Sequence, residues 1–144
     1  MALVFSLFSA QLFAEEIGII TSAAEIDYPP FSITNPAGEA DGFSVELLRA
    51  PLAAMNRDVS FRTGTWAEVK NLLEKGEIKA LPLVGRTPER EEVLDFTIPY
   101  MTLHGAIVVR EETENITSLN ELQGKKVAVM KMDNAEEFLK RKKL

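Results

Sequence analysis

The sequence predicts an α/β fold, because segments with the apolar character of buried strands alternate along the chain with segments of helical periodicity. Turn residues and helix caps separate these segments. Since parallel strands need crossover connections, the order predicts a largely parallel sheet covered by helices on both faces. The segments with strand character are residues 16–21, 59–62, 78–84, 103–110 and 127–130.

The first predicted helices begin at recognisable cap residues. Ser44 caps a helix whose apolar positions 45, 48, 52 and 55 share one face. Pro51 lies inside this helix and predicts a kink or a later start, because proline lacks the donor of one intrahelical hydrogen bond. Capping boxes of the Ser/Thr-x-x-Glu type open two more helices, at 65–68 and at 118–121.

Two further helices adjoin loops of the kind that hold ligands. Thr87 begins a short helix containing Arg90, and Asp133 or Asn134 caps a last helix over 135–143. In α/β sheets, ligands bind at the carboxyl ends of strands, beside helix amino termini. The loops that meet this condition, and therefore form the candidate site, are residues 28–31, 84–90 and 131–134.

The composition excludes several kinds of site. A formal net charge of −6 argues against a nucleic-acid partner, because phosphate binding needs a face of clustered Lys and Arg. The basic run at 140–143 is interpreted as a helix terminus that meets the macrodipole. With no cysteine and a single histidine, the chain offers no thiol chemistry and no His/Cys zinc site. His104, on the predicted 103–110 strand, is interpreted as structural, and no metal or cofactor is expected.

The first fourteen residues carry no charge and are mostly apolar. This run is too short to span a bilayer, which takes about 20 residues. It ends at the small residue Ala14, as signal-peptide cleavage requires, although no Lys or Arg precedes it and Leu12 lies where a smaller residue is preferred. We predict a signal peptide at 1–14 that directs the chain to the periplasm. A buried first strand or helix is the alternative.

Several motifs occur in a fixed order along almost all of residues 16–140. They are YPPF at 28–31, GFSVELL at 42–48, Trp66 at a helix start, TPER at 87–90, DFTIPY at 95–100 and SLNELQGKKVAV at 118–129. Together they resemble the bacterial extracellular solute-binding proteins of family 3, the periplasmic binders of polar amino acids. ALPLVG at 80–85 resembles the version that serves as the sensor domain of histidine kinases and diguanylate cyclases.

The resemblance implies a periplasmic binding protein type II fold, in which two α/β lobes close over a ligand. It implies lobe one over 15–110, then a crossover and partial lobe two over 111–144, as in a carboxy-terminally truncated member. Such a chain is expected to bind its ligand weakly and to self-associate. The implied ligand is a small carboxylate such as an amino acid. The implied protein partner is an ABC permease or a fused membrane signalling protein.

The resemblance also assigns ligand-binding roles. Arg90 would grip the ligand carboxylate, since its planar fork of donors suits that group. The alternative is a surface arginine paired with Glu89, Glu91 or Glu92.

Four other ligand contacts are implied. Tyr28 and Trp66 would be aromatic walls, or else core residues. Gly85 would offer only its backbone N–H, and Asn134 would present helix-terminal donors from lobe two, or act as a plain cap.

Two positions depart from the family pattern. Lys79 replaces a usual Asp, and Met132 replaces a usual Gly before the last helix. Met132 is expected to disturb the anion-binding turn, because glycine adopts backbone angles that methionine resists.

Two other interpretations stay open. A few relatives of this kind are cyclohexadienyl dehydratases, and a general acid would then come from Glu46, Asp95 or Asp133. Each of these also suits a cap or a surface position. Since the sequence contains no paired carboxylates at one site and no catalytic motif, no catalytic residue is assigned. The chain would otherwise be a non-functional truncated fragment.

Overall fold

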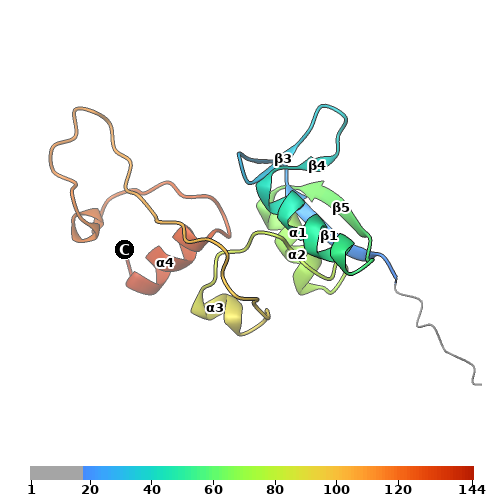
Figure 1. The fold of residues 1–144 in the computed structure, drawn as a ribbon. Coiled ribbons are helices and arrows are strands. Elements are labelled where there is room, and N and C mark those ends of the chain that lie inside the picture. The colour runs from blue at the N-terminus through green and yellow to red at the C-terminus, as the bar shows by residue number, and fades with distance from the viewer. Residues whose placement is uncertain (1–17) are drawn as a thin grey trace, which may run out of the picture.

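The computed structural model describes residues 18–144. The predicted signal peptide at 1–14 lies outside the described residues. Two small sheets with two helices make up the amino-terminal part, and a long irregular chain with three short helices makes up the rest (Figure 1). Within residues 18–144, none of the helices has the length and apolar character needed to cross a bilayer.

The centre of the amino-terminal part is a parallel strand pair. β1 (Ile20–Glu25) pairs along its whole length with β5 (Val59–Gly64). On its other edge β1 forms one parallel bridge, to Ala80. The strand predicted at 78–84 is therefore reduced to a single bridge, because Pro82 has no N–H to extend the ladder.

A second, antiparallel sheet covers the carboxyl end of β1. Its strands are β2 (Asp27–Tyr28), β3 (Ser32–Thr34) and β4 (Ala40–Asp41), in the order β2-β3-β4. The loop predicted at 28–31 thus joins two short strands. At Gly42, where φ is 109°, a Cβ atom would approach the Phe31 carbonyl oxygen to 2.7 Å. Glycine is required there because the chain turns tightly against its own backbone.

The predicted capping boxes are confirmed. The Thr65 N–H donates to the Glu68 carboxylate at 2.8 Å, and the Ser118 N–H donates to the Glu121 carboxylate at 2.8 Å. The second box opens only one 3-10 turn, shorter than the predicted helix. The helices are α1 (Phe43–Ala54), α2 (Trp66–Glu74), α3 (Pro88–Glu91), the 3-10 helix η1 (Leu119–Leu122) and α4 (Asn134–Lys142).

The start of α1 differs from the prediction. Gly42 is the N-cap, so the assignment of Ser44 as cap is wrong. Ser44 lies inside the helix, and its buried hydroxyl is 3.2 Å from the Tyr100 hydroxyl. The helix runs through Pro51, on its exposed face, to Ala54. The later start that the proline suggested is therefore also wrong.

The two faces of β1 carry the two halves of the core. Ala23 packs with buried residues of α2, whereas Ala24, its neighbour, packs with Val45 of α1. Successive strand residues point to opposite faces, so a helix covers each face of the sheet. This confirms the predicted α/β arrangement. The buried members of the larger cluster are Ala23, Trp66, Val69 and Ile78.

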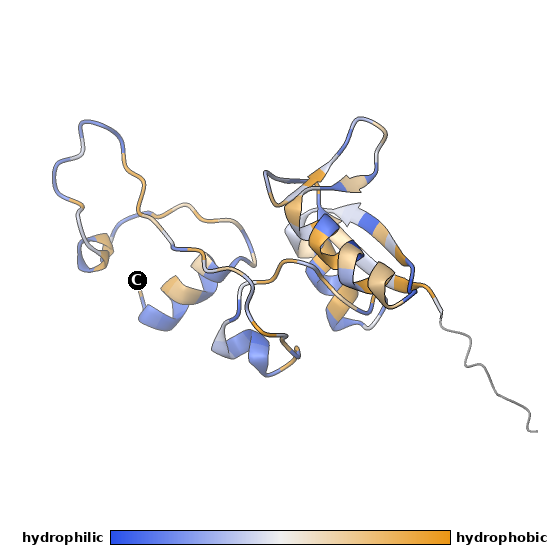
Figure 2. Cartoon of the chain, in the orientation of Figure 1, coloured by the Kyte–Doolittle hydropathy of each residue, from blue (hydrophilic) through white to orange (hydrophobic). Residues whose placement is uncertain are grey.

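The strands predicted at 103–110 and 127–130 are wrong. Neither segment is paired in the described part of the chain, and Val108 is 89% exposed. Apolar stretches run along the irregular chain between α3 and α4 (Figure 2). A strand forms only where a second backbone supplies its hydrogen bonds, and no strand described within residues 18–144 pairs with these segments. His104 consequently lies on an unpaired segment.

Truncating the core should unfold the chain far more readily than truncating its surface. Ile78 is 1% exposed and Ile19 is 62% exposed. Ile78→Ala leaves a cavity and is expected to lower the free energy of unfolding by about 2–5 kcal/mol. The matched control Ile19→Ala should change it by less than about 0.5 kcal/mol. Urea unfolding monitored by Trp66 fluorescence measures both, and similar losses would contradict this assignment of the core.

Candidate functional site

The turn before α3 directs Arg90 into the molecule. Thr87 caps the helix, accepting the Arg90 backbone N–H on Oγ1 at 3.3 Å, and Pro88 occupies the first helical position, which needs no donor. Because α3 is a single turn, its geometry depends on this cap. The result is an arginine only 2% exposed, on a helix whose other charged residues face solvent.

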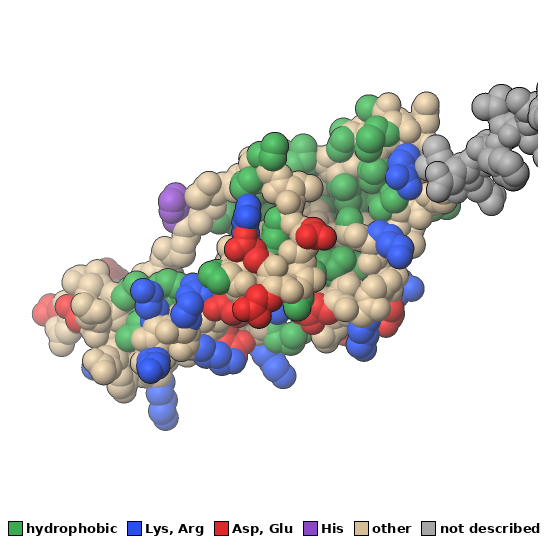
Figure 3. All heavy atoms as spheres, turned by 90° about the horizontal axis from the view of Figure 1, so that it is seen from below, with side chains coloured by type: hydrophobic (Ala, Val, Ile, Leu, Met, Phe, Trp, Pro, Cys, Tyr) green, Lys and Arg blue, Asp and Glu red, His purple; other side chains and the backbone are tan. Residues whose placement is uncertain are grey.

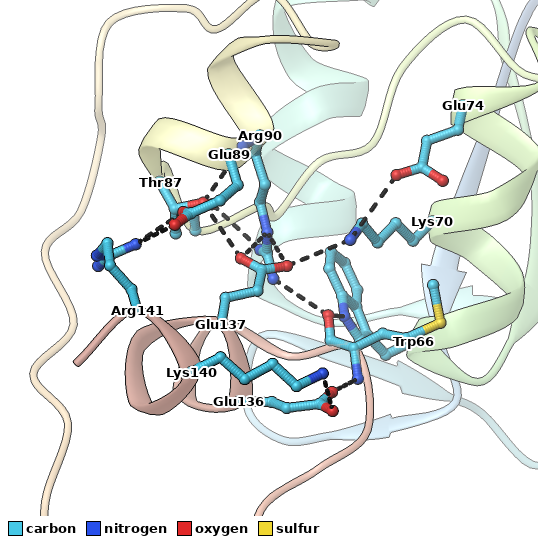
Figure 4. Close-up of polar contacts among 12 residues, drawn as sticks. Trp66, Lys70, Glu74, Thr87, Glu89, Arg90, Glu136, Glu137, Lys140 and Arg141 are labelled. Carbon is cyan, nitrogen blue, oxygen red and sulfur yellow. Dashed lines mark hydrogen bonds and ion pairs between the residues drawn. The ribbon is translucent and has the colours of Figure 1, made fainter. Parts of the chain in front are cut away.

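Each nitrogen of the Arg90 guanidinium has a partner. Nε donates to both carboxylate oxygens of Glu137, at 3.1 and 3.0 Å, Nη1 donates to the Gly85 carbonyl at 3.1 Å, and Nη2 donates to the Met132 carbonyl at 3.3 Å. The guanidinium carbon also lies 4.9 Å from the centre of the Trp66 ring, a cation–π contact. Arg90 is therefore buried with an acceptor at each of its three side-chain nitrogens (Figure 4).

The Glu137 carboxylate receives donors from three residues that precede it in the chain. Besides Arg90 Nε, these are Lys70 Nζ from α2 and Thr87 Oγ1, both at 3.2 Å. The Lys70 side chain is 13% exposed and that of Glu137 is 16% exposed. We call these three donor groups, from Lys70, Thr87 and Arg90, the carboxylate site. They converge on one carboxylate that comes from α4 (Figure 4).

The acidic neighbours of Arg90 pair elsewhere. Glu91 pairs with Arg86, and Glu89 receives both of its contacts from Arg141 of α4, at 2.6 and 2.7 Å. The hydrogen bonds from Arg141 lower the pKa of Glu89. Acidic and basic side chains lie next to one another on the face seen from below (Figure 3). Arg90 is thus buried, whereas its neighbours Glu89 and Glu91 form exposed ion pairs with other arginines.

Trp66 is both a core residue and part of this site. It is 6% exposed, and its Nε1 donates to the Met132 carbonyl at 2.7 Å. Tyr28 is placed differently. It lies on β2, is 36% exposed, and contacts Phe31 with ring centres 5.6 Å apart. The two predicted aromatic walls are therefore not brought together at Arg90.

Gly85 and Asn134 lie next to each other. A Cβ atom at Gly85 would lie 2.9 Å from the side-chain nitrogen of Asn134, so any larger residue would require that amide to shift. Gly85 contributes its carbonyl to Arg90, whereas its N–H was expected to act. Asn134 is the first residue of α4, after the N-cap Asp133.

The turn before α4 forms despite Met132. This residue takes a positive φ of 64°, the conformation that a glycine would adopt more easily. Its N–H donates to the Glu136 carboxylate at 2.5 Å, and its carbonyl accepts from Trp66 and Arg90. The hydrogen bond from Lys140, followed by that from Met132, lowers the pKa of Glu136. Local hydrogen bonds therefore hold the turn that the sequence was expected to disturb.

A groove of about 390 Å³ borders Trp66, where the carboxyl end of β1 meets the segment before α4. Two carboxylates, Glu25 and Asp27, line it, and sequence reasoning did not single them out. Burial, and then the charge of Asp133, raises the pKa of Glu25 above its ordinary value of 4.5. Their place just after a strand of a parallel pair was the signal that could have identified them. The lining residues are Glu25, Ile26, Asp27, Thr65, Trp66, Ala67, Met130 and Lys131.

Comparison with known proteins adds to this geometry. The L-cystine-binding protein of Escherichia coli strain K12 is 30% identical over 129 residues, which cover 88% of this chain and 48% of that protein. The histidine kinase sensor domain described as similar to periplasmic binding proteins is 30% identical, with a TM-score of 0.80, over 87% of this chain and 55% of that one.

Two further solved structures are informative. An ancestral arginine-binding protein bound to arginine is 30% identical, with a TM-score of 0.74, over 86% of this chain and 55% of that one. An ancestral cyclohexadienyl dehydratase is 29% identical, with a TM-score of 0.51, over 58% of this chain and 35% of that one. The similar proteins are thus mainly binding proteins, with a dehydratase among them.

The chain spans about half the length of the proteins that it matches, and its mixed α/β fold is that of the corresponding half of a periplasmic binding protein. The model of one family, described as bacterial extracellular solute-binding proteins, family 3, matches residues 20–143. These residues comprise nearly the whole described chain, and the chain belongs to that family.

Proposed function

We propose that this chain is the ligand-recognition part of an exported protein that binds an amino acid by its carboxylate and performs no chemistry. One observation carries the proposal: the donors of Lys70, Thr87 and Arg90 converge on a single carboxylate in a nearly buried position. Donors to an ionised carboxylate give short and strong hydrogen bonds, and the guanidinium is suited to them by its geometry. In our proposal lobe one is 15–110, and 111–144 begins lobe two.

The groove supports an amino acid over a simple acid. Glu25 and Asp27 lie in it together, and Trp66 borders both the groove and Arg90. An ammonium group in the groove would give the partly buried Glu25 a counter-ion, while the ligand carboxylate meets Arg90. The binding of arginine and of cystine by similar proteins agrees with a ligand of this class. Delivery to an ABC permease and control of a membrane sensor both begin with this binding step.

A dehydratase activity is the second candidate. The raised pKa of Glu25 is a property that a general acid needs. Of the acids suggested by the sequence, Glu46 pairs with Arg49 on the surface, Asp95 is exposed, and Asp133 occupies the N-cap position of α4. Incubation with prephenate or arogenate is expected to give no aromatic product. Formation of an aromatic product would contradict the proposed binding function and favour a dehydratase.

Replacing Arg90 should weaken binding selectively. Arg90→Lys keeps the charge but removes the planar fork, which costs a charge-assisted contact of about 1.5–3 kcal/mol, or roughly ten- to a hundredfold in affinity. Titration with L-arginine, L-glutamine and L-cystine, followed by Trp66 fluorescence, measures it. The matched control is Arg86→Lys in the same loop, where an exposed pair with Glu91 is changed. Equal affinities of the two variants would mean that Arg90 does not hold the ligand.

The stability of the chain should report the environment of Glu25. Its folded-state pKa lies above 4.5, so the folded state binds this proton more tightly than the unfolded state does. That contribution favours folding below the unfolded pKa and is lost as pH rises through the folded pKa. The side chain of Glu25→Gln does not titrate. The difference in unfolding free energy between this variant and the parent should therefore favour the variant more at about pH 7 than at about pH 4. Urea midpoints at both pH values test this, and a pH-independent difference would contradict it.

The export prediction has a direct test. In a Gram-negative host we expect a periplasmic product that starts at Glu15, identified by mass spectrometry of the periplasmic fraction. A charge within the apolar run, Leu7→Arg, should block export and leave the uncleaved chain in the cytoplasm. Recovery of the parent chain in the cytoplasm with residues 1–14 attached would contradict the proposed localisation.

A further inference from the structure

We propose that Glu137 is an internal occupant of the carboxylate site, which the carboxylate of a ligand must displace, so that ligand binding competes with the docking of α4. The inference rests on the proposed function of Arg90. It adds a residue that sets the affinity for the ligand and a segment that moves when the ligand binds.

The first argument is chemical identity. Glu137 presents to the site the same group that an amino acid would present. Its Oε1 accepts from Arg90 Nε at 3.1 Å and from Lys70 Nζ at 3.2 Å, and its Oε2 accepts from Arg90 Nε at 3.0 Å and from Thr87 Oγ1 at 3.2 Å. A ligand carboxylate in the same position would use the same donors. A ligand carboxylate in this position would compete with Glu137 for Arg90 Nε and Thr87 Oγ1, because each of these atoms carries a single hydrogen and that hydrogen already contacts Glu137.

The second argument is that Arg90 needs a counter-ion when no ligand is bound. Arg90 is 2% exposed, and a buried guanidinium without a counter-ion is strongly unfavourable. Glu137 supplies the counter-ion when no ligand is present. Once a ligand carboxylate takes over that role, the loss of Glu137 leaves no buried charge unpaired. The exchange of one carboxylate for another is therefore feasible, whereas simple departure of Glu137 is not.

The third argument is the way α4 is held. No residue of this helix is fully buried, and its apolar residues Phe138 and Leu139 are only partly buried. Met132, just before the helix, packs against the core cluster, and polar contacts supply the rest of the docking. Besides Glu137, the contacts are the exposed Arg141–Glu89 pair and the hydrogen bonds to the Met132 carbonyl just before the helix. Exposed pairs are worth at most about 1 kcal/mol each. Glu137 is therefore the principal attachment of the helix, and the one that a ligand attacks.

The chain contains its own reporter of this exchange. Trp66 is the single tryptophan, and its indole both stacks on Arg90 and donates to the Met132 carbonyl. Undocking of α4 breaks that hydrogen bond and exposes the ring. Titrating the whole chain with sodium acetate, against sodium chloride at equal ionic strength, should therefore shift the emission of Trp66 only with acetate.

The decisive comparison uses two variants, each of which removes one carboxylate that helps to hold α4. Glu137→Gln removes the competing charge from the carboxylate site. Glu89→Gln removes the exposed contact of α4 with Arg141 and leaves the site intact. The apparent dissociation constants for acetate and for L-glutamine should fall roughly ten- to a hundredfold in Glu137→Gln, and about fivefold at most in Glu89→Gln.

Melting temperatures with and without acetate keep the test valid if the variants are less stable than the parent. Glu137→Ala leaves Arg90 without its counter-ion and should melt at a lower temperature. Acetate should then restore part of that loss by filling the vacant position, an effect not expected in Glu89→Gln. Absence of this rescue, together with equal affinities of parent and Glu137→Gln for L-glutamine, would overturn the inference and leave the proposed function standing. Failure of every variant to bind acetate or any amino acid would overturn both.

Discussion

Burial of the Arg90 guanidinium is the constraint on which the rest of the site depends. A charge at 2% exposure needs a counter-ion and hydrogen-bond acceptors from the protein, because the interior does not solvate it. The chain supplies Glu137, two carbonyls and the face of Trp66. To do so it brings α4 back against residues that precede it by 47 positions. The position of the carboxy-terminal segment follows from this one requirement.

The two parts of the chain are consequently held by different forces. The amino-terminal part has an apolar core on both faces of β1, and packing of this kind is lost only on unfolding. The carboxy-terminal part docks through ion pairs and hydrogen bonds, and α4 has no buried residue. Polar contacts of this sort can be exchanged for equivalent ones. A site that opens and closes on a charged ligand needs one part that stays folded and a second part whose polar contacts can be replaced by contacts with the ligand.

The site has positively charged donors in one place and carboxylates in another. Positive donors gather at Arg90, and the negative groups Glu25 and Asp27 lie in the groove beyond Trp66. An amino acid carries opposite charges at its two ends and matches that order. The raised pKa of Glu25 reflects a carboxylate held partly out of water, and a bound ammonium would relieve its cost.

The sequence by itself determined the features that depend on neighbouring residues. The capping boxes at 65–68 and 118–121, the capped turn at 87–90 and the alternation of strands and helices up to residue 74 are local patterns, and so they could be read before folding. The motifs also identified the family and selected Arg90. The tertiary structure alone decided which groups meet. Lys70 and Glu137 are 67 positions apart, and nothing in the pattern of either marks it as a partner of the other. The segments 103–110 and 127–130 failed as strands for the same reason: an apolar run is a property of one segment, whereas a strand needs the backbone of another.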